Sequence, residues 1–288
     1  MEDIKLSIHP INQAKINGLN YHFIEKGSGE AIVFLHGFPD LAHTWDYSIS
    51  QLSDKYKCIA PNMRGYYPTD MATDNDYSGK KIAEDILKLT EHLGINSFYL
   101  VGQDWGASIA YALANLAPDK VTKLITVAIP HPRFIKPSLK LLIKARHFFV
   151  FRNKKRSVKK MQKNDFKLVD TLYQRWSPNM KDYKKHSEVV KQTFALPGRT
   201  EAALAYYWSF FDNANDKELG KFYAQLPKMP TLAIAGKTDG ALILDQFYDM
   251  EKGMPEDFRL RISETAGHFL HNEVPDYFIT ELLDFIKK

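Results

Sequence analysis

The pattern of apolar and polar residues predicts that strands and helices alternate along the first 130 residues. Four short apolar runs have the length and the Gly or Pro flanks of buried strands; they lie at 31–35, 56–61, 97–101 and 121–129. Between them, segments 78–93 and 107–116 carry apolar residues at helical spacing. Such alternation is typical of a parallel sheet that helices cover on both faces.

Further elements are predicted on either side of this region. Asn17-Gly18 is a strong tight-turn signal, so the segments 14–16 and 19–24 are expected to form a hairpin. After residue 227 the strand–helix rhythm resumes, with a strand at 231–235, a helix near 242–250, a strand at 258–262 and a closing helix from Pro275. The last two strands of the sheet therefore lie beyond a long interruption.

The interruption, residues 131–227, has apolar spacings of three and four but no convincing strand. We therefore predict a core formed by 1–130 and 228–288, with 131–227 inserted as an all-helical cap, or lid, over the sheet. The cap contains a dense basic run from Arg152 to Lys163. A solvated helix face is the favoured interpretation of that run, and a surface for an acidic partner is the alternative.

Composition narrows the functional class. Hydrophobic residues are 44% and charged residues 25% of the 288, as in ordinary globular proteins. The net charge of +5, from 39 basic and 34 acidic residues, is too small to indicate nucleic acid binding. The single cysteine, Cys58, excludes an internal disulfide framework and is expected to be buried and inert.

Targeting and cofactor motifs are missing from the sequence. The N-terminus lacks the basic-then-apolar order of a signal peptide, and no apolar stretch reaches the ~20 residues of a membrane helix. The cytoplasm is therefore the expected location and membrane insertion is not expected, although a chain trimmed of its leader would look the same. No metal-ligand cluster, phosphate loop or dinucleotide fingerprint appears, so neither a metal nor a cofactor is expected.

The most informative segment is 100–107, in which a predicted strand ends at Gly102 and a helix begins near Gly106. One functional side chain, Asp104, stands between the two glycines. This is the layout of a nucleophile elbow, with aspartate where serine is usual. The glycines are needed because a Cβ atom would clash in so tight a turn. Taken alone, the motif also fits an aspartate that merely caps the helix.

Other strand ends provide the context that favours catalysis. Directly after the strand 31–35, the sequence His-Gly-Phe-Pro at 36–39 offers the N–H of Phe38, which with the N–H of Trp105 would form an oxyanion hole. His36 itself is expected to be structural. Asp239 follows the strand 231–235, and His268 follows the last strand.

The order of these residues is nucleophile, acid, histidine, as in the nucleophile-elbow fold. We therefore predict Asp104 as nucleophile, His268 as general base and Asp239 as the acid that orients it. Asp245 is the competing acid, but it lies in a predicted helix rather than at a strand end.

With these motifs, the chain resembles the epoxide hydrolase and haloalkane dehalogenase branch of the α/β-hydrolases. The resemblance covers nearly the whole chain outside the cap. Its motifs are 36–39, Arg-Gly-Tyr at 64–66, 102–106, Asp239 and Gly-His at 267–268. It implies an α/β-hydrolase fold, a mostly parallel sheet flanked by helices, with an inserted helical cap. It also implies a covalent alkyl ester on Asp104, which water activated by His268 then hydrolyses.

Within that branch, enzymes that open epoxides carry two proton donors on the cap. The resemblance assigns these roles to Tyr207 and His147, with the adjacent Tyr206 as a rival to Tyr207. Trp208 stands where many relatives have arginine, which is a departure from the pattern. The implied function is the opening of a small apolar epoxide to a vicinal diol. A homodimer is a further option for the assembly, and no nucleic acid is implied.

Haloalkane dehalogenase is the main alternative, because the same aspartate can displace halide. Trp105 fits a halide site, but Phe38 stands where many dehalogenases have asparagine; Trp176 or Trp208 would have to supply the second indole. A fluoroacetate-type dehalogenase is less favoured, because it needs an arginine after the nucleophile. A non-catalytic ligand-binding protein is disfavoured by the complete triad. An esterase is disfavoured because acyl transfer to aspartate would give a labile anhydride.

Overall fold

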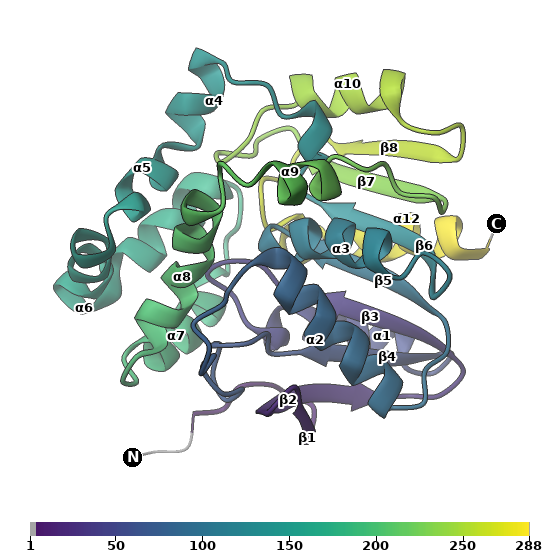
Figure 1. Ribbon diagram of the computed structural model, residues 1–288, viewed down its shortest axis with the longest axis horizontal. Coiled ribbons are helices and arrows are strands. Elements are labelled where there is room, and N and C mark those ends of the chain that lie inside the picture. The colour runs from purple at the N-terminus through teal and green to yellow at the C-terminus, as the bar shows by residue number, and fades with distance from the viewer. Residues whose placement is uncertain (1–3, 288) are drawn as a thin grey trace.

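The computed structural model describes residues 4–287 as a layered α/β structure, in which helices cover both faces of an eight-stranded sheet (Figure 1). The strand order is β1-β2-β4-β3-β5-β6-β7-β8. All pairs from β4 to β8 are parallel, and β1 and β2 form an antiparallel edge. The strands are β1 (Ile11–Ile16), β2 (Leu19–Lys26), β3 (Glu30–Leu35), β4 (Tyr56–Pro61), β5 (Phe98–Gln103), β6 (Val121–Val127), β7 (Thr231–Gly236) and β8 (Phe258–Ser263).

The helices divide into those that flank the sheet and those of the cap. Flanking helices are η1 (Ala42–Trp45), α1 (Asp46–Leu52), α2 (Gly79–His92), α3 (Trp105–Leu116), α10 (Asp245–Gly253), α11 (Leu270–Glu273) and α12 (Pro275–Lys287). Between β6 and β7 lie η2 (Pro132–Phe134), α4 (Leu139–Lys144), α5 (Arg146–Arg152), α6 (Lys154–Trp176), α7 (Tyr183–Phe194), α8 (Arg199–Asp212) and α9 (Lys217–Tyr223). The predicted fold class, a mostly parallel sheet with an inserted all-helical segment, is confirmed.

Local sequence signals explain where several elements begin and turn. β1 and β2 pair through a two-residue turn in which both Asn17 and Gly18 have positive φ, 49° and 84°. That conformation suits the right-handed twist of a hairpin and is favoured by Asn-Gly. The side chain of Ser78 accepts the N–H of Lys81 at 3.3 Å and so caps α2.

Two helices begin at residues that differ from the prediction. α3 begins at Trp105 rather than near residue 107, because the elbow leads into the helix without a linker. α10 begins at Asp245 rather than near residue 242. There the Oδ1 atom of Asp239 accepts the N–H groups of Ala241 and Leu242, at 2.6 and 3.0 Å. These bonds hold the preceding residues in a turn instead of a helix.

The central strands are buried on both faces, as helices on both sides of a parallel sheet require. Within β3, residues 32–35 are all fully buried. Cys58 in β4 is also fully buried, as expected, and burial raises the pKa of its thiol to about 12, which disfavours the reactive thiolate. Among the described residues, no helix is both long and apolar enough to cross a bilayer.

A buried ion pair ties α2 to the loop after β4. The guanidinium of Arg64 donates to both carboxylate oxygens of Asp85, at 2.6 and 2.9 Å, and the two side chains are 1% and 0% exposed. Removing Asp85 leaves the buried Arg64 guanidinium with the half-exposed Asp74, 3.3 Å away, in place of a buried partner. We expect Asp85→Ala to lower the free energy of unfolding by about 3–5 kcal/mol in urea titrations. Glu84→Ala, at the neighbouring and partly exposed Lys81 pair, should cost less than ~1 kcal/mol.

Candidate active site

Asp104 lies at the turn between β5 and α3 in a strained backbone conformation, with φ 52° and ψ −122°. A Cβ atom on Gly102 would lie 2.3 Å from the carbonyl oxygen of Gly106, and one on Gly106 would lie 2.2 Å from that of Leu35. Both glycines are therefore needed for the turn. The Asp104 side chain does not accept the capping hydrogen bond that would come from an N–H beyond the first residue of α3, which removes the helix-cap interpretation.

The Asp104 carboxylate is held by donors on both of its oxygens. Oδ1 accepts the N–H of Phe38 at 2.9 Å, and the N–H of Trp105 also donates to the carboxylate. Oδ2 lies 3.1 Å from Nε2 of His268. Burial raises the pKa of Asp104, but the bonds and charge of His268 and the two backbone N–H groups outweigh it, so the pKa is lowered. Asp104 is therefore an ionised carboxylate that lies beside the imidazole of His268.

His268 links Asp104 to Asp239. Its Nδ1 atom lies 2.9 Å from Oδ2 of Asp239, whose other oxygen accepts the backbone N–H groups at 241 and 242. Burial lowers the pKa of His268, but the charge of Asp239 and the bonds to both carboxylates raise it to about 10. The three residues expected at separate strand ends thus form one connected chain. Asp245, the alternative acid, lies on the surface in an ion pair with Lys140.

Of the two adjacent tyrosines on α8, Tyr207 faces Asp104. Its ring is 1% exposed, its centroid lies 5.1 Å from those of Phe38 and Trp105, and the Trp105 side chain is hydrogen-bonded to it. Burial and then the Asp104 charge raise its pKa well above the usual value, so its hydroxyl keeps its proton. The Tyr206 hydroxyl instead donates to the carbonyl oxygen of Arg64 at 2.9 Å.

His147 on α5 lies on the same side of the cap. Its side chain is buried, and its ring centroid is 5.8 Å from that of Tyr207 and 4.7 Å from that of Trp176. Burial lowers the pKa of His147 to about 3, so the ring is neutral near pH 7. Arg175 lies 3.4 Å from Nδ1 of His147.

Trp176, at the end of α6, was offered by the sequence only as a second indole for a halide, but it also holds the site through its backbone. Its backbone carbonyl accepts the N–H groups of both Gly240 and His268, at 3.1 and 3.0 Å. Its ring lies 5.1 Å from the His268 ring, and its buried Nε1 has no hydrogen-bond partner in the described structure. The sequence offered one signal of this contact, the glycine at 240. A Cβ atom there would lie 1.8 Å from the carbonyl oxygen of Arg175, so only glycine lets the two segments approach so closely.

The site thus combines a strained turn that carries Asp104 with an acid and a histidine that follow two neighbouring strands. A helical cap lies over these residues. A family model described as alpha/beta hydrolase fold matches residues 30–275. The chain belongs to the α/β-hydrolase fold family. This confirms the family implied by the sequence motifs.

Similar α/β-hydrolases include several that are named for one activity. The chain is 27% identical over 286 residues to epoxide hydrolase 1 of Caenorhabditis elegans, covering 95% of this chain and 69% of that protein. It is 26% identical over 300 residues to human epoxide hydrolase 4, covering 100% and 81%. A solved structure of Bacillus megaterium epoxide hydrolase with an inhibitor superposes with a TM-score of 0.81 at 25% identity, covering 96% of this chain and 100% of that one.

The raised pKa of His268 makes the stability of this α/β-hydrolase depend on pH. Because the folded pKa, about 10, exceeds the ordinary 6.5, the protonated ring stabilises the fold below about pH 6.5, and this contribution is lost as pH rises through about 10. Asp104→Asn removes one anion that raises the pKa. Urea titrations between pH 7 and 10 should therefore show a steeper loss of stability in the wild-type chain than in this variant. Equal slopes would contradict the assigned cause.

Proposed function

We propose that this α/β-hydrolase opens a small apolar epoxide to a vicinal diol through an ester on Asp104. The observation that carries the proposal is that the ionised Asp104 has a general base on the core side and a protonated phenol on the cap side. The base is His268 and the phenol is Tyr207. A nucleophile for carbon and a proton donor for the departing oxygen are the two groups that ring opening needs. The names of the similar proteins support the same reaction.

In the first step, Asp104 attacks a ring carbon and the carbon–oxygen bond of the epoxide breaks. The developing alkoxide takes a proton from Tyr207, and the neutral ring of His147 offers a second N–H donor. The site around them is walled by the aromatic rings of Phe38, Trp105 and Phe148, which suit an apolar substrate and exclude water.

In the second step, water attacks the carbonyl carbon of the ester. Esterification removes the negative charge of Asp104, one of the interactions that raise the pKa of His268. The imidazolium therefore loses its proton more easily; passed through solvent, this proton restores the Tyr207 phenolate left by ring opening to the phenol. The neutral imidazole is then the base that takes a proton from the attacking water, and it returns that proton to the departing alkoxide when the ester breaks. The N–H groups of Phe38 and Trp105, which already hold the Asp104 carboxylate, would bind the tetrahedral oxyanion. One such donor is typically worth ~3 kcal/mol in the transition state.

Haloalkane dehalogenation is the second candidate, and the free indole N–H of Trp176 is the observation that favours it. An unpartnered N–H in an apolar site is the kind of donor that a halide needs. The other indole considered, that of Trp208, donates to the carbonyl oxygen of Phe151 at 2.9 Å and is occupied. Dehalogenation, however, has no use for a protonated phenol, which ring opening requires.

Intact-protein mass spectrometry of His268→Gln tests both candidates. The substitution removes the base of the second step, so the ester should accumulate when the variant is incubated with a simple epoxide. We expect a mass gain equal to the whole epoxide, and no gain when Asp104→Asn is added. A gain from a bromoalkane, equal to its mass without bromine, and none from epoxides would instead assign dehalogenation. The absence of any adduct with either panel would count against both reactions.

A further inference from the structure

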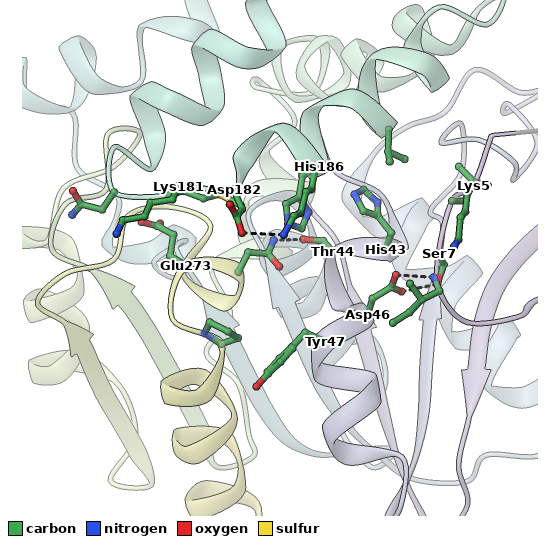
Figure 2. A pocket seen from close by; sticks show the side chains of 18 residues that line it. Lys5, Ser7, His43, Thr44, Asp46, Tyr47, Lys181, Asp182, His186 and Glu273 are labelled. Atoms are coloured by element: carbon green, nitrogen blue, oxygen red, sulfur yellow. Dashed lines mark hydrogen bonds and ion pairs between the residues drawn. The ribbon is translucent and has the colours of Figure 1, made fainter.

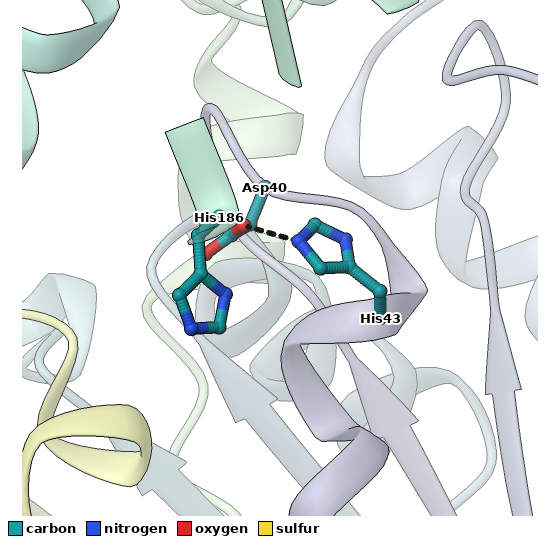
Figure 3. A group of neighbouring side chains, drawn as sticks. All are labelled: Asp40, His43 and His186. Carbon is teal, nitrogen blue, oxygen red and sulfur yellow. Dashed lines mark ion pairs between the residues drawn. The ribbon is translucent and has the colours of Figure 1, made fainter. Parts of the chain in front are cut away.

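Asp40, His43 and His186 converge where the cap meets the core (Figure 3). Asp40 and His43 lie in the loop after β3 and on η1, and His186 lies on α7. Their ligand atoms all lie within 4.8 Å of one another. His43 and His186 also line an open pocket of about 810 Å³, drawn in Figure 2, so a small ion could reach them from solvent.

The two histidines lack the hydrogen bonds that buried rings normally have. The His43 side chain is only 8% exposed, yet neither of its ring nitrogens has a partner in the described structure, and nor does Nδ1 of His186. Nε2 of His43 lies 3.6 Å from Oδ1 of Asp40, too far for a hydrogen bond. Two histidines with unpartnered ring nitrogens thus lie beside one buried carboxylate.

The carboxylate is oriented by hydroxyl groups behind it. Oδ1 of Asp40 accepts from Tyr173 at 2.7 Å, and Oδ2 accepts from Thr44 at 3.1 Å. Such outer contacts fix the direction of a ligating carboxylate.

We propose that Asp40, His43 and His186 bind a divalent transition metal of the zinc type. Two imidazole nitrogens and one carboxylate oxygen are a preferred donor set for Zn²⁺ and leave an open position that water from the pocket can fill. The ion would join α7 of the cap to the loop that carries Phe38. The sequence predicts no such site, because His186 lies far along the chain from the other two ligands.

Titration of the chelator-treated full chain with Co²⁺ and Zn²⁺ tests the site. We expect one equivalent of Co²⁺ to give a visible ligand-field spectrum that Zn²⁺ displaces. His43→Ala and His186→Ala should each weaken binding at least about tenfold. His92→Ala, at an exposed histidine on α2, is the matched control and should bind as the wild type does.

Thermal unfolding gives a second measurement, which does not depend on the spectrum. Saturating Zn²⁺ should raise the Tm of the wild-type chain and of His92→Ala, but not that of His186→Ala. Because His186 is partly exposed, this variant tests the proposal even if His43→Ala fails to fold. Absence of stoichiometric binding, or binding that neither ligand substitution weakens, would overturn the proposal.

A separate observation concerns the charge of residues 131–163, which we name the basic cap segment. It holds 12 of the 39 lysines and arginines and none of the 34 acidic residues, so the rest of the chain is acidic in net. Three of its lysines pair with acidic residues of other segments. The α4 and α5 helices and the start of α6 follow one another along the outer edge of the cap in Figure 1.

The same segment exposes large apolar side chains. They are Ile135, Leu139, Leu142, Ile143 and Phe149, between 40% and 75% exposed. The three on α4 are spaced three and four residues apart and therefore share one face of that helix. A helix face that is merely solvated does not expose a cluster of large apolar side chains. A nucleic acid site does not require one either, because it binds phosphate mainly through charge.

We infer that the basic cap segment docks on an anionic lipid bilayer. Apolar side chains in the acyl boundary with cations around them are the composition of interfacial membrane helices. The exposed Phe210 extends this surface toward the active site, with its ring 5.5 Å from that of Phe148 and 6.3 Å from that of Trp105. If the proposed function holds, apolar epoxides dissolved in lipid would enter here.

Flotation of the purified chain with vesicles tests docking without any assay of activity, so its result is independent of the proposed reaction. We expect binding to phosphatidylserine–phosphatidylcholine vesicles and not to phosphatidylcholine alone. Reversing Lys155, Lys159 and Lys160 to glutamate should weaken binding about 100-fold. The control reverses three exposed lysines outside the segment, Lys55, Lys217 and Lys252. It changes the net charge by the same amount and should have little effect on vesicle binding.

Leu142→Ser with Phe149→Ser tests the apolar part of the surface. Loss of vesicle binding in this double variant would support docking in the acyl boundary. Binding that is unchanged would show adsorption by charge alone and would overturn the proposal. The absence of wild-type binding to anionic vesicles would also overturn it, and binding to duplex DNA or heparin in its place would assign the segment to a polyanion.

Discussion

Asp104→Asn should lower the rate of epoxide hydrolysis by on the order of 10⁴-fold or more. The amide keeps the shape of the side chain and tolerates the positive φ of the elbow, but it is not a nucleophile for carbon. The loss should appear in kcat, because the substrate pocket is unchanged. Steady-state kinetics with a chromogenic epoxide, alongside circular dichroism to verify folding, measure the effect.

The matched control is Asp245→Asn, which makes the same chemical change at the exposed acid that competed for the role in the triad. Its activity should stay close to that of the wild type. If Asp104→Asn retained more than a few per cent of activity while folded, a direct attack of water on the epoxide would replace the covalent route.

Tyr207→Phe should lower the rate of ester formation by about 10²–10⁴-fold, the usual contribution of a positioned proton donor. The change deletes one oxygen from a ring that packs on Phe38 and Trp105, so packing is preserved. The remaining donor, His147, should account for the residual activity. Single-turnover kinetics in the His268→Gln background isolate this step, because the ester then accumulates.

Tyr206→Phe is the control for the tyrosine substitution. The Tyr206 hydroxyl bonds the carbonyl oxygen of Arg64, in the loop that holds the buried ion pair. Its loss should cost about 1 kcal/mol of stability and leave ester formation within a few fold of the wild type. A larger kinetic effect in Tyr206→Phe than in Tyr207→Phe would reverse the assignment of the two residues.

The strand-end residues could be predicted from sequence because a parallel sheet has a simple geometry. Short apolar runs locate the strands, and their carboxyl ends share one edge. Polar residues that directly follow them, such as Asp104, Asp239 and His268, therefore lie close together wherever they occur in the chain. The glycines around Asp104 add a local steric signal that needs no tertiary information.

The cap contributions could not be predicted in the same way. In a helical insertion, the direction of a side chain depends on how the helices pack, and adjacent residues such as Tyr206 and Tyr207 point about 100° apart. Only the packed structure shows which one faces the nucleophile. The role of Trp176 was harder still, because it acts through its backbone carbonyl, which every residue has.

That one carbonyl oxygen also restricts how the enzyme can admit its substrate. Asp104, His268 and Tyr207 are all less than a tenth exposed, so the cap covers the nucleophile, the base and the proton donor together. Lifting the end of α6 would break both hydrogen bonds from Gly240 and His268 to Trp176 and release the acid and base together. The end of α6 therefore has to stay in place while the triad works, so the cap is tied to the core at the point where the acid and the base are aligned.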